Sequence, residues 1–345
     1  MAMNEGIRGP AQPLLTVRGL QKHFPLKRDP LGRGGGVVRA VDGVDFEVLK
    51  GETLGVVGES GCGKSTTARL LMQLIQPTAG EVVFDGRAVG SRDLPLKEFR
   101  RQVQMVFQDS YASLNPRLTI EDSVAFGPQV HGVSKHESTD RARDLLVRVG
   151  LDPLRFAERY PHELSGGQRQ RVNIARALAL QPRMVILDEA VSALDKSVEA
   201  QVINLLLDLK AEFGLTYVFI SHDLNVVRYM SDRVMVMYLG QVAEIGPSDA
   251  LYAAPAHPYT RALLSSMPSM DPDHRTEAAS LAGDPPNPIN PPSGCRFHPR
   301  CPLAAPVCSE RVPVPVVAGA AQAVSCLMYE PGSGHPQAQP LAHAA

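Results

Sequence analysis

The segment GESGCGKS (58–65) decides the fold of this chain, because it fits a phosphate-binding loop in its expected setting. The apolar run LGVV (54–57) precedes it and indicates a buried strand, while STTARLLMQLI (65–75) follows it and indicates a helix. Glycines let the backbone wrap around phosphate oxygens, and a helix N-terminus adds partial positive charge. We expect Lys64 to neutralise β- and γ-phosphates and Ser65 to ligate Mg²⁺. Phosphate contacts are expected along the whole loop: Gly58, Glu59, Ser60, Gly61, Cys62, Gly63, Lys64, Ser65 and Thr66.

The surrounding sequence follows the pattern of an α/β fold. Like LGVVG (54–58), the runs MVIL (184–187) and YVFIS (217–221) are each followed by a polar loop and a helical pattern, which is typical of a parallel sheet covered by helices. Residues 14–56 alternate as strands do. Residues 109–164 begin with turns and become helical around 137–150, which indicates a small helical subdomain inserted in the α/β core.

Two acids end the strand MVIL. We expect Asp188 at the strand tip to hold Mg²⁺, and Glu189 to orient or deprotonate an attacking water. An acidic pair after a strand is often only a polar strand end. The phosphate-binding loop upstream favours the catalytic interpretation.

Composition excludes some classes of protein. The 345 residues are 44% hydrophobic and 21% charged with a net charge of −1, which argues against a nucleic-acid binder that works by bulk charge. No apolar run approaches the ~18 residues that span a bilayer. The N-terminal MAMNEGIRGP lacks an apolar signal core, so we expect a cytoplasmic protein whose membrane association comes through a partner. We interpret the longest apolar stretch, Val312 to Val324, as an extended tail.

The most diagnostic string is Leu164-Ser165-Gly166-Gly167-Gln168. With the phosphate-binding loop upstream and LDE (187–189) downstream, the chain resembles ABC-type nucleotide-binding subunits over roughly residues 14–250. The resemblance implies an α/β P-loop NTPase of ABC type with an antiparallel β subdomain and a helical subdomain at about 109–164. It also implies that this signature segment binds the γ-phosphate of ATP held by the opposite subunit of a dimer.

Four further positions match the family. Phe24 corresponds to the aromatic residue that stacks on adenine, although a lone Phe is usually a core residue. Gln108 matches the glutamine that touches Mg²⁺ and the catalytic water, and His222 in ISHD matches the histidine that contacts the γ-phosphate. Asp195 in SALD matches the aspartate that crosses the dimer interface.

Three positions depart from the family pattern. Ala190 replaces the proline that often follows the catalytic glutamate, and Ser110 replaces a proline after Gln108. Lys196 follows SALD, where relatives carry a small apolar residue. None of these changes removes a catalytic group.

The organisation of the chain selects among ABC proteins. DNA-repair and condensation members insert a long coiled coil before the signature, translation members carry two motif sets, and exporters usually fuse membrane helices to the same chain; none of these features is present. The strings KHFPLKR, DSYASLNPRLTI, HPYTRALLSSMP and NPPSGCRFHPRCP resemble dipeptide/oligopeptide importer ATPases, and KHFP with YASLNPR resembles the second of their two paired ATPases. Nickel and glutathione importers share the same group, and a non-transport ABC ATPase is the more distant alternative.

The resemblance also implies partners. These are a second, paralogous ATPase in a heterodimer, two membrane permease subunits at the cytoplasmic face of the inner or plasma membrane, and indirectly a substrate-binding protein. No nucleic acid is expected. Tyr111 to Arg117 is expected to form part of the surface that contacts a membrane subunit, although YASLNPR is also compatible with a simple turn.

The C-terminal region, residues 251–345, carries a cysteine cluster and ends in a tail that we expect to be disordered. Cys295, Cys301, Cys308 and Cys326 lie at spacings that are too loose for paired zinc knuckles. Similar tails on peptide-importer ATPases are associated with an iron–sulfur cluster, so the resemblance favours [4Fe–4S] over zinc. Buried or reduced thiols without a metal are the alternative.

Overall fold

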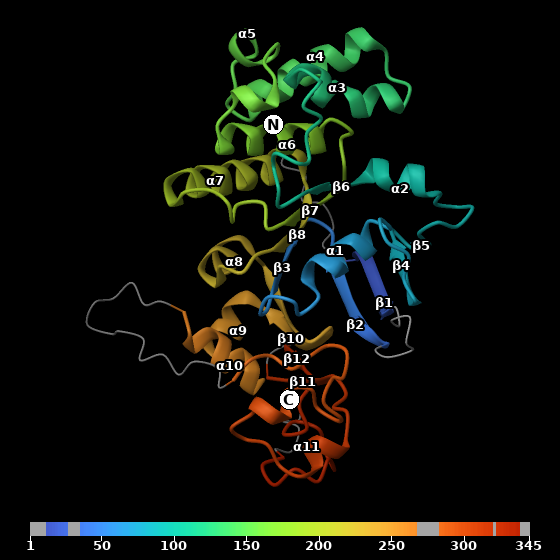
Figure 1. Cartoon of the computed structure of the whole chain (residues 1–345), viewed down its shortest axis with the longest axis vertical. Helices are drawn as coiled ribbons and strands as arrows, with labels where there is room; N and C mark the ends of the chain where they lie inside the picture. The colour runs from blue at the N-terminus through green and yellow to red at the C-terminus, as the bar shows by residue number, and fades with distance from the viewer. Residues whose placement is uncertain (1–11, 27–34, 268–282, 320–321, 339–345) are drawn as a thin grey trace, which may run out of the picture.

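The computed structural model describes residues 12–26, 35–267, 283–319 and 322–338, and its described strands form two sheets (Figure 1). The larger sheet has the order β11-β12-β10-β9-β3-β8-β7-β6. The strands from β9 to β6 run parallel, as the buried apolar runs predicted. Its strands are β3 (Thr53–Val57), β6 (Val103–Val106), β7 (Met184–Asp188), β8 (Thr216–Ile220), β9 (Arg233–Tyr238), β10 (Gln241–Pro247), β11 (Val316–Ala318) and β12 (Gln322–Val324).

The smaller sheet is antiparallel and has the order β2-β1-β4-β5. Its strands are β1 (Pro13–Leu26), β2 (Gly36–Leu49), β4 (Ala79–Phe84) and β5 (Arg87–Ala88). Alternate residues such as Leu15, Val17 and Val48 are buried, and they pack with α1 (Lys64–Leu71) and α2 (Leu96–Gln102). The expected antiparallel β subdomain is thereby confirmed.

Helices gather at one end of the molecule (Figure 1). They are α3 (Ile120–Val130), α4 (Lys135–Arg148), the short α5 (Pro153–Phe156), η1 (Pro161–Glu163) and α6 (Gly166–Leu178). The helical pattern around 137–150 corresponds to α4. The sequence reasoning did not single out α3, although the Thr119 side chain caps it by accepting a hydrogen bond from Asp122 N–H at 3.1 Å.

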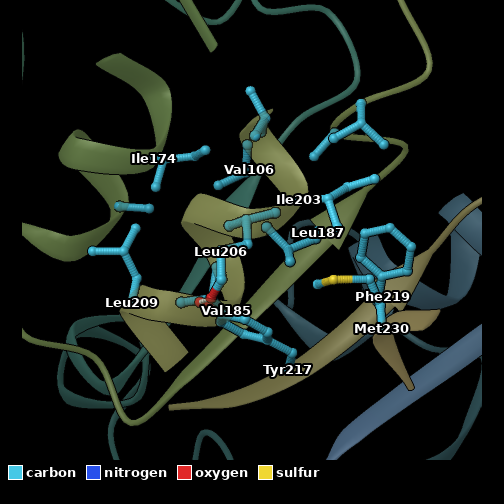
Figure 2. Packing of buried hydrophobic residues seen from close by; sticks show 14 of the residues in the cluster. Val106, Ile174, Val185, Leu187, Ile203, Leu206, Leu209, Tyr217, Phe219 and Met230 are labelled. Atoms are coloured by element: carbon cyan, nitrogen blue, oxygen red, sulfur yellow. Dashed lines mark hydrogen bonds between the residues drawn. The ribbon is translucent and has the colours of Figure 1, made fainter. Parts of the chain in front are cut away.

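The core between the parallel strands and the helices consists of buried aliphatic and aromatic residues. Figure 2 shows Val185, Leu187 and Phe219 of β7 and β8 against Leu206 and other residues of α7 (Lys196–Phe213). The buried Tyr217 hydroxyl is hydrogen-bonded, because it donates to the Leu206 carbonyl at 3.0 Å. α7 ends at Gly214, whose φ of 62° is the left-handed conformation that stops a helix. α8 (Leu224–Met230) closes the same core.

The C-terminal part packs onto the central sheet. It comprises α9 (Ser248–Ala253), α10 (Pro258–Ser265), η2 (His298–Arg300), α11 (Val307–Glu310), β11 and β12. β12 pairs antiparallel with β10, with Glu244 opposite Val324, because β10 would otherwise leave an unpaired edge. Our interpretation of Val312–Val324 as a tail is therefore wrong for the parts that form β11 and β12. The expected disorder at the end of the chain falls on residues 339–345, which lie outside the described residues.

In the described part of the chain, no helix is both long enough and apolar enough to cross a bilayer.

Candidate active site

The loop between β3 and α1 is built on glycines that no other residue could replace. Gly58 and Gly63 have φ of 148° and 109°, in the left-handed half of conformational space. A Cβ on Gly58 would lie 2.2 Å from the Met237 carbonyl oxygen, and one on Gly63 would lie 2.3 Å from that of Ala40. The loop is thus pressed against β9 and β2, which fixes its shape.

Lys64 begins α1 and folds back over this loop. Its Nζ donates to the Gly58 carbonyl at 2.7 Å and to the Glu59 carbonyl at 3.0 Å, and the residue is 6% exposed. The cation is therefore held at the mouth of the loop, where the N-terminus of α1 adds its own partial positive charge.

A cleft of about 390 Å³ opens beside the loop. It brings together residues from β2, the loop, α1 and the segments that follow β6, β7 and β8. Its lining residues are Ala40, Ser60, Gly61, Gly63, Lys64, Ser65, Thr66, Gln108, Glu189 and His222. Residues that are far apart in the sequence meet here because the carboxyl ends of parallel strands share one edge of the sheet.

Oxygen ligands suited to Mg²⁺ lie at the base of the cleft. Ser65 Oγ donates to Asp188 Oδ1 at 2.9 Å. Burial raises the pKa of Asp188, the Ser65 hydrogen bond opposes the rise, and the neighbouring Glu189 charge adds to it. A hydroxyl and a nearly buried carboxylate form the hard-oxygen donor set that this cation prefers, so these residues fit the ion.

Glu189 follows β7 in a strained backbone conformation, with a φ of 48°. Its N–H donates to the Ile220 carbonyl at 3.0 Å, which ties the turn to β8. Gln108 Nε2 donates to Glu189 Oε2 at 2.8 Å, and His222 Nδ1 lies 3.5 Å from the same oxygen. Three predicted catalytic side chains thus converge on one point of the cleft, where a water molecule would be oriented.

The signature segment lies elsewhere in the same protomer. Ser165 caps α6 by accepting from Gln168 N–H, and Gln168 Oε1 accepts from Ser165 N–H at 3.0 Å. Gly167 is needed because a Cβ there would lie 2.4 Å from Val198 Cγ1. Ser165, Gly166, Gly167 and Gln168 are not among the residues that line the cleft.

Two more predicted site residues, Asp195 and Phe24, do not line the cleft. Asp195 caps α7 by accepting from Val198 N–H at 3.0 Å, and this hydrogen bond lowers its pKa. Phe24 lies on β1 opposite Val38, is 38% exposed, and has Lys22 Nζ 5.1 Å from its ring centroid. Neither side chain reaches the loop within this protomer.

Two of the departures have a clear place in the structure. Lys196 Nζ pairs with Glu199 at 2.8 Å and with Asp223 at 2.9 Å, so it links the start of α7 to the segment that follows His222. Ala190 is 3% exposed and packs into the core. Nothing in the structure explains Ser110.

Sequence reasoning missed three residues at the site. Ala40 of β2 lines the cleft, and Tyr259 and Arg300 reach the loop from the C-terminal part, at Glu59. HPYT (257–260) and FHPRC (297–301) were noted only as family strings, because no local spacing reveals a long-range contact.

Comparisons with known proteins assign the family. The sequence profile described as "ABC transporter" matches residues 41–192, and the profile for the C-terminal region of oligopeptide/dipeptide transporters matches residues 243–308. A probable peptide ABC transporter ATP-binding protein of Sinorhizobium fredii is 52% identical, over 93% of this chain and 91% of that protein. The chain belongs to the ABC transporter family of ATP-binding proteins.

Other members of the ABC family agree in sequence and fold. The oligopeptide transport ATP-binding protein AppF of Bacillus subtilis is 50% identical, over 92% of this chain and 98% of its own. The cassette MJ0796, solved as a dimer bound to ADP and Pi, shares 30% identity with a TM-score of 0.59, over 68% of this chain and 98% of that one. CbiO1 of Clostridium perfringens shares 28% identity with a TM-score of 0.60, over 70% of this chain and 91% of that one.

The four C-terminal cysteines of this ABC protein line one small cavity of about 10 Å³, which has room for about one water molecule. In the described residues, no group of three or more His, Cys, Asp or Glu side chains is arranged to hold a metal ion. Burial raises the pKa of Cys295 to about 11 and that of Cys326 to about 12, which favours neutral thiols. The structure therefore brings the four thiols together but does not support the expected iron–sulfur cluster.

Proposed function

We propose that this chain binds and hydrolyses MgATP and thereby powers the import of dipeptides or oligopeptides through separate membrane subunits. One observation supports the motor role above all: Lys64, Ser65, Gln108, Glu189 and His222 line a single cleft. The peptide cargo is supported by the relatives named as peptide or oligopeptide transport proteins and by the C-terminal profile.

In this proposal the loop binds the triphosphate. Backbone N–H groups of residues 58–66 and the Lys64 ammonium surround the β- and γ-phosphates. Ser65 Oγ, with Asp188 and Gln108, holds Mg²⁺. When bound, the ion neutralises charge that develops on the phosphate oxygens.

Hydrolysis is assigned to three polar side chains of the same cleft, Gln108, Glu189 and His222. Glu189 accepts a proton from the attacking water, and the Gln108 amide keeps the carboxylate turned toward the cleft. His222, whose Nδ1 lies 3.5 Å from Glu189 Oε2, is assigned to the γ-phosphate. Phe24 is assigned to the adenine ring.

A second subunit completes the site. Ser165 to Gln168 and Asp195 do not line the cleft of their own protomer, which supports assigning them to a nucleotide held by a partner. The dimeric cassette MJ0796 with ADP and Pi supports such an arrangement. We propose a paralogous ATPase as the partner.

The remaining assembly is proposed from the relatives. Residues 14–250 form the ATPase domain and residues 251–345 the extension, and two permease subunits hold the chain at the cytoplasmic face of the membrane. A substrate-binding protein delivers the cargo. Tyr111, 52% exposed on the helical side, lies in the segment proposed to contact a permease subunit.

Uptake of a radiolabelled tripeptide tests this function in cells that lack the gene. The native gene should restore uptake, whereas Glu189→Gln should not, although its product is present in equal amount. Restored nickel or glutathione uptake with unchanged peptide uptake would reassign the cargo. Uptake of all three solutes independent of the gene would refute a role in import.

The cysteine cluster calls for its own test. Convergence of four thiols on one cavity supports a shared structural role, either as free thiols or as metal ligands. Iron, sulfide and zinc should be assayed on protein purified without oxygen. Four iron and four sulfide per chain would show a [4Fe–4S] cluster, for which the cavity must be larger than in this structure. One zinc per chain would instead show a tetrahedral site with thiolate ligands.

A further inference from the structure

The C-terminal part reaches the phosphate-binding loop at Glu59. Arg300 Nη1 donates to Glu59 Oε2 at 2.7 Å, and Arg300 Nη2 donates to Glu59 Oε1 at 3.0 Å. The Arg300 side chain is 5% exposed, and that of Glu59 is 22% exposed. Such a bidentate pair fixes the orientation of a carboxylate and balances its charge.

A second contact holds the backbone of the same residue. The Tyr259 hydroxyl of α10 accepts a hydrogen bond from Glu59 N–H at 2.9 Å. Tyr259 is fully buried, and its ring lies 4.6 Å from that of Tyr238 and 5.4 Å from that of Phe297. Tyr259 therefore hydrogen-bonds to the backbone of Glu59, and Arg300 hydrogen-bonds to its side chain; both residues come from the C-terminal part.

A third contact runs through a neighbouring turn. Arg296 donates to the Leu239 carbonyl and pairs with Asp42 of β2. The adjacent Gly240 N–H donates to the Cys62 carbonyl of the loop at 2.8 Å. Two arginines from one short segment thus brace the loop from two sides.

The charge of Glu59 gives the Arg300 contact an electrostatic consequence. A carboxylate on a loop that binds a polyphosphate places like charge near the ligand, and this repulsion is large where the site is partly desolvated. Arg300 supplies the opposite charge and turns the carboxylate toward η2. Without it, an unpaired, partly buried carboxylate would remain on the loop that we assign to the triphosphate.

We propose that Arg300 is a positioning residue for ATP: by holding and neutralising Glu59, it gives the phosphate-binding loop the shape and potential that the triphosphate needs. The inference rests on the proposed function, because it assumes that nucleotide binds at residues 58–66. It makes the C-terminal part a component of the nucleotide site.

Titration of the full-length chain with a fluorescent ATP analogue and Mg²⁺ tests the proposal. Arg300→Gln should weaken affinity about tenfold, as expected for loss of a coupled, charge-assisted contact. Adding Glu59→Gln should restore affinity to within about threefold of the native value, because removing both partners leaves no unpaired charge. A role in folding alone would lower the melting temperature of Arg300→Gln and leave the affinity of the folded protein native.

Three further variants keep the test decisive. Arg311→Gln breaks a matched pair with Glu330, 2.6 Å long and also in the C-terminal part, and should leave affinity unchanged. Arg300→Lys keeps the charge and should bind with intermediate affinity; it replaces Arg300→Gln if thermal unfolding shows that the latter is misfolded. Lys64→Ala should abolish binding.

The outcomes separate the two proposals. Native affinity in Lys64→Ala would refute nucleotide binding at the loop and the inference with it. Loss of binding in Lys64→Ala together with native affinity in a folded Arg300→Gln would refute only the role of Arg300. A double variant as weak as Arg300→Gln alone would also overturn it.

Discussion

Gln108 Nε2 lies 2.8 Å from Glu189 Oε2, so the segment after β6 and the segment after β7 are joined at the centre of the cleft. This bond connects the start of the helical region to the group that we assign to water activation. A shift of the helical region would move Gln108 relative to Glu189. We therefore expect rearrangement of the helices to affect the hydrolytic site through this bond.

Replacing the carboxylate of Glu189 should separate binding from hydrolysis. Glu189→Gln keeps the size of the side chain but removes the base, so we expect unchanged MgATP affinity and a kcat lower by about 10²- to 10⁴-fold. Phosphate release and nucleotide titration on the same preparation measure both. Near-normal turnover would remove Glu189 from its assigned role.

The close approach of β2 to the loop should make Gly63 irreplaceable. Gly63→Ala puts a Cβ 2.3 Å from the Ala40 carbonyl oxygen, so the loop must move and ATP affinity should fall more than about tenfold. Gly86→Ala is the matched control, since Gly86 has φ of 75° but nothing within 4 Å of its Cβ. It should cost about 1 kcal/mol of stability and no affinity. Equal affinities in the two variants would contradict the steric argument.

Ser165 should matter for hydrolysis beyond its role as a helix cap. Ser165→Ala and Ser134→Ala each remove an N-cap hydroxyl, of α6 and α4, and each should cost about 1 kcal/mol of unfolding free energy. Only Ser165→Ala should also lower ATP turnover, because we assign its hydroxyl to the nucleotide of the partner subunit. Initial nucleotide affinity of the lone chain should stay native. Equal turnover in both variants would assign Ser165 to capping alone.

Glu244 should make stability depend on pH. Burial raises its pKa, while hydrogen bonds from the N–H groups of Ala256 and His257 oppose the rise. Between the ordinary pKa of 4.5 and the raised pKa, the unfolded chain has released this proton while the folded chain still holds it. The free energy of unfolding therefore carries the full contribution of Glu244 below pH 4.5 and loses it as the pH rises to the raised pKa.

Comparison with Glu244→Gln isolates this effect, because the variant has no proton to release at that position. The melting temperature of the native chain relative to the variant should fall from about pH 4.5 upward and then level off. Thermal unfolding at half-unit steps of pH measures it. Parallel curves for the two proteins would show that Glu244 titrates normally.

Local patterns were enough to predict much of the site. The loop 58–65, the acids 188 and 189, and the signature at Ser165 are short strings whose chemistry depends on immediate neighbours. The apolar runs predicted the parallel strands because strands buried on both faces need unbroken hydrophobic residues. The helix α3 was not singled out, since its cap at Thr119 lies in a turn-rich stretch that carries a weaker pattern.

What the sequence by itself determined is the kind of chemistry: a loop for phosphate, oxygens for Mg²⁺ and a carboxylate for water. Only the tertiary structure decided which groups share a cleft, that Ser165 is not among them, and that Arg300 and Tyr259 contact Glu59. The physical reason is that motifs are set by neighbours along the chain. Packing of strands and helices decides contacts between residues as far apart as 59 and 300, and no local pattern encodes them.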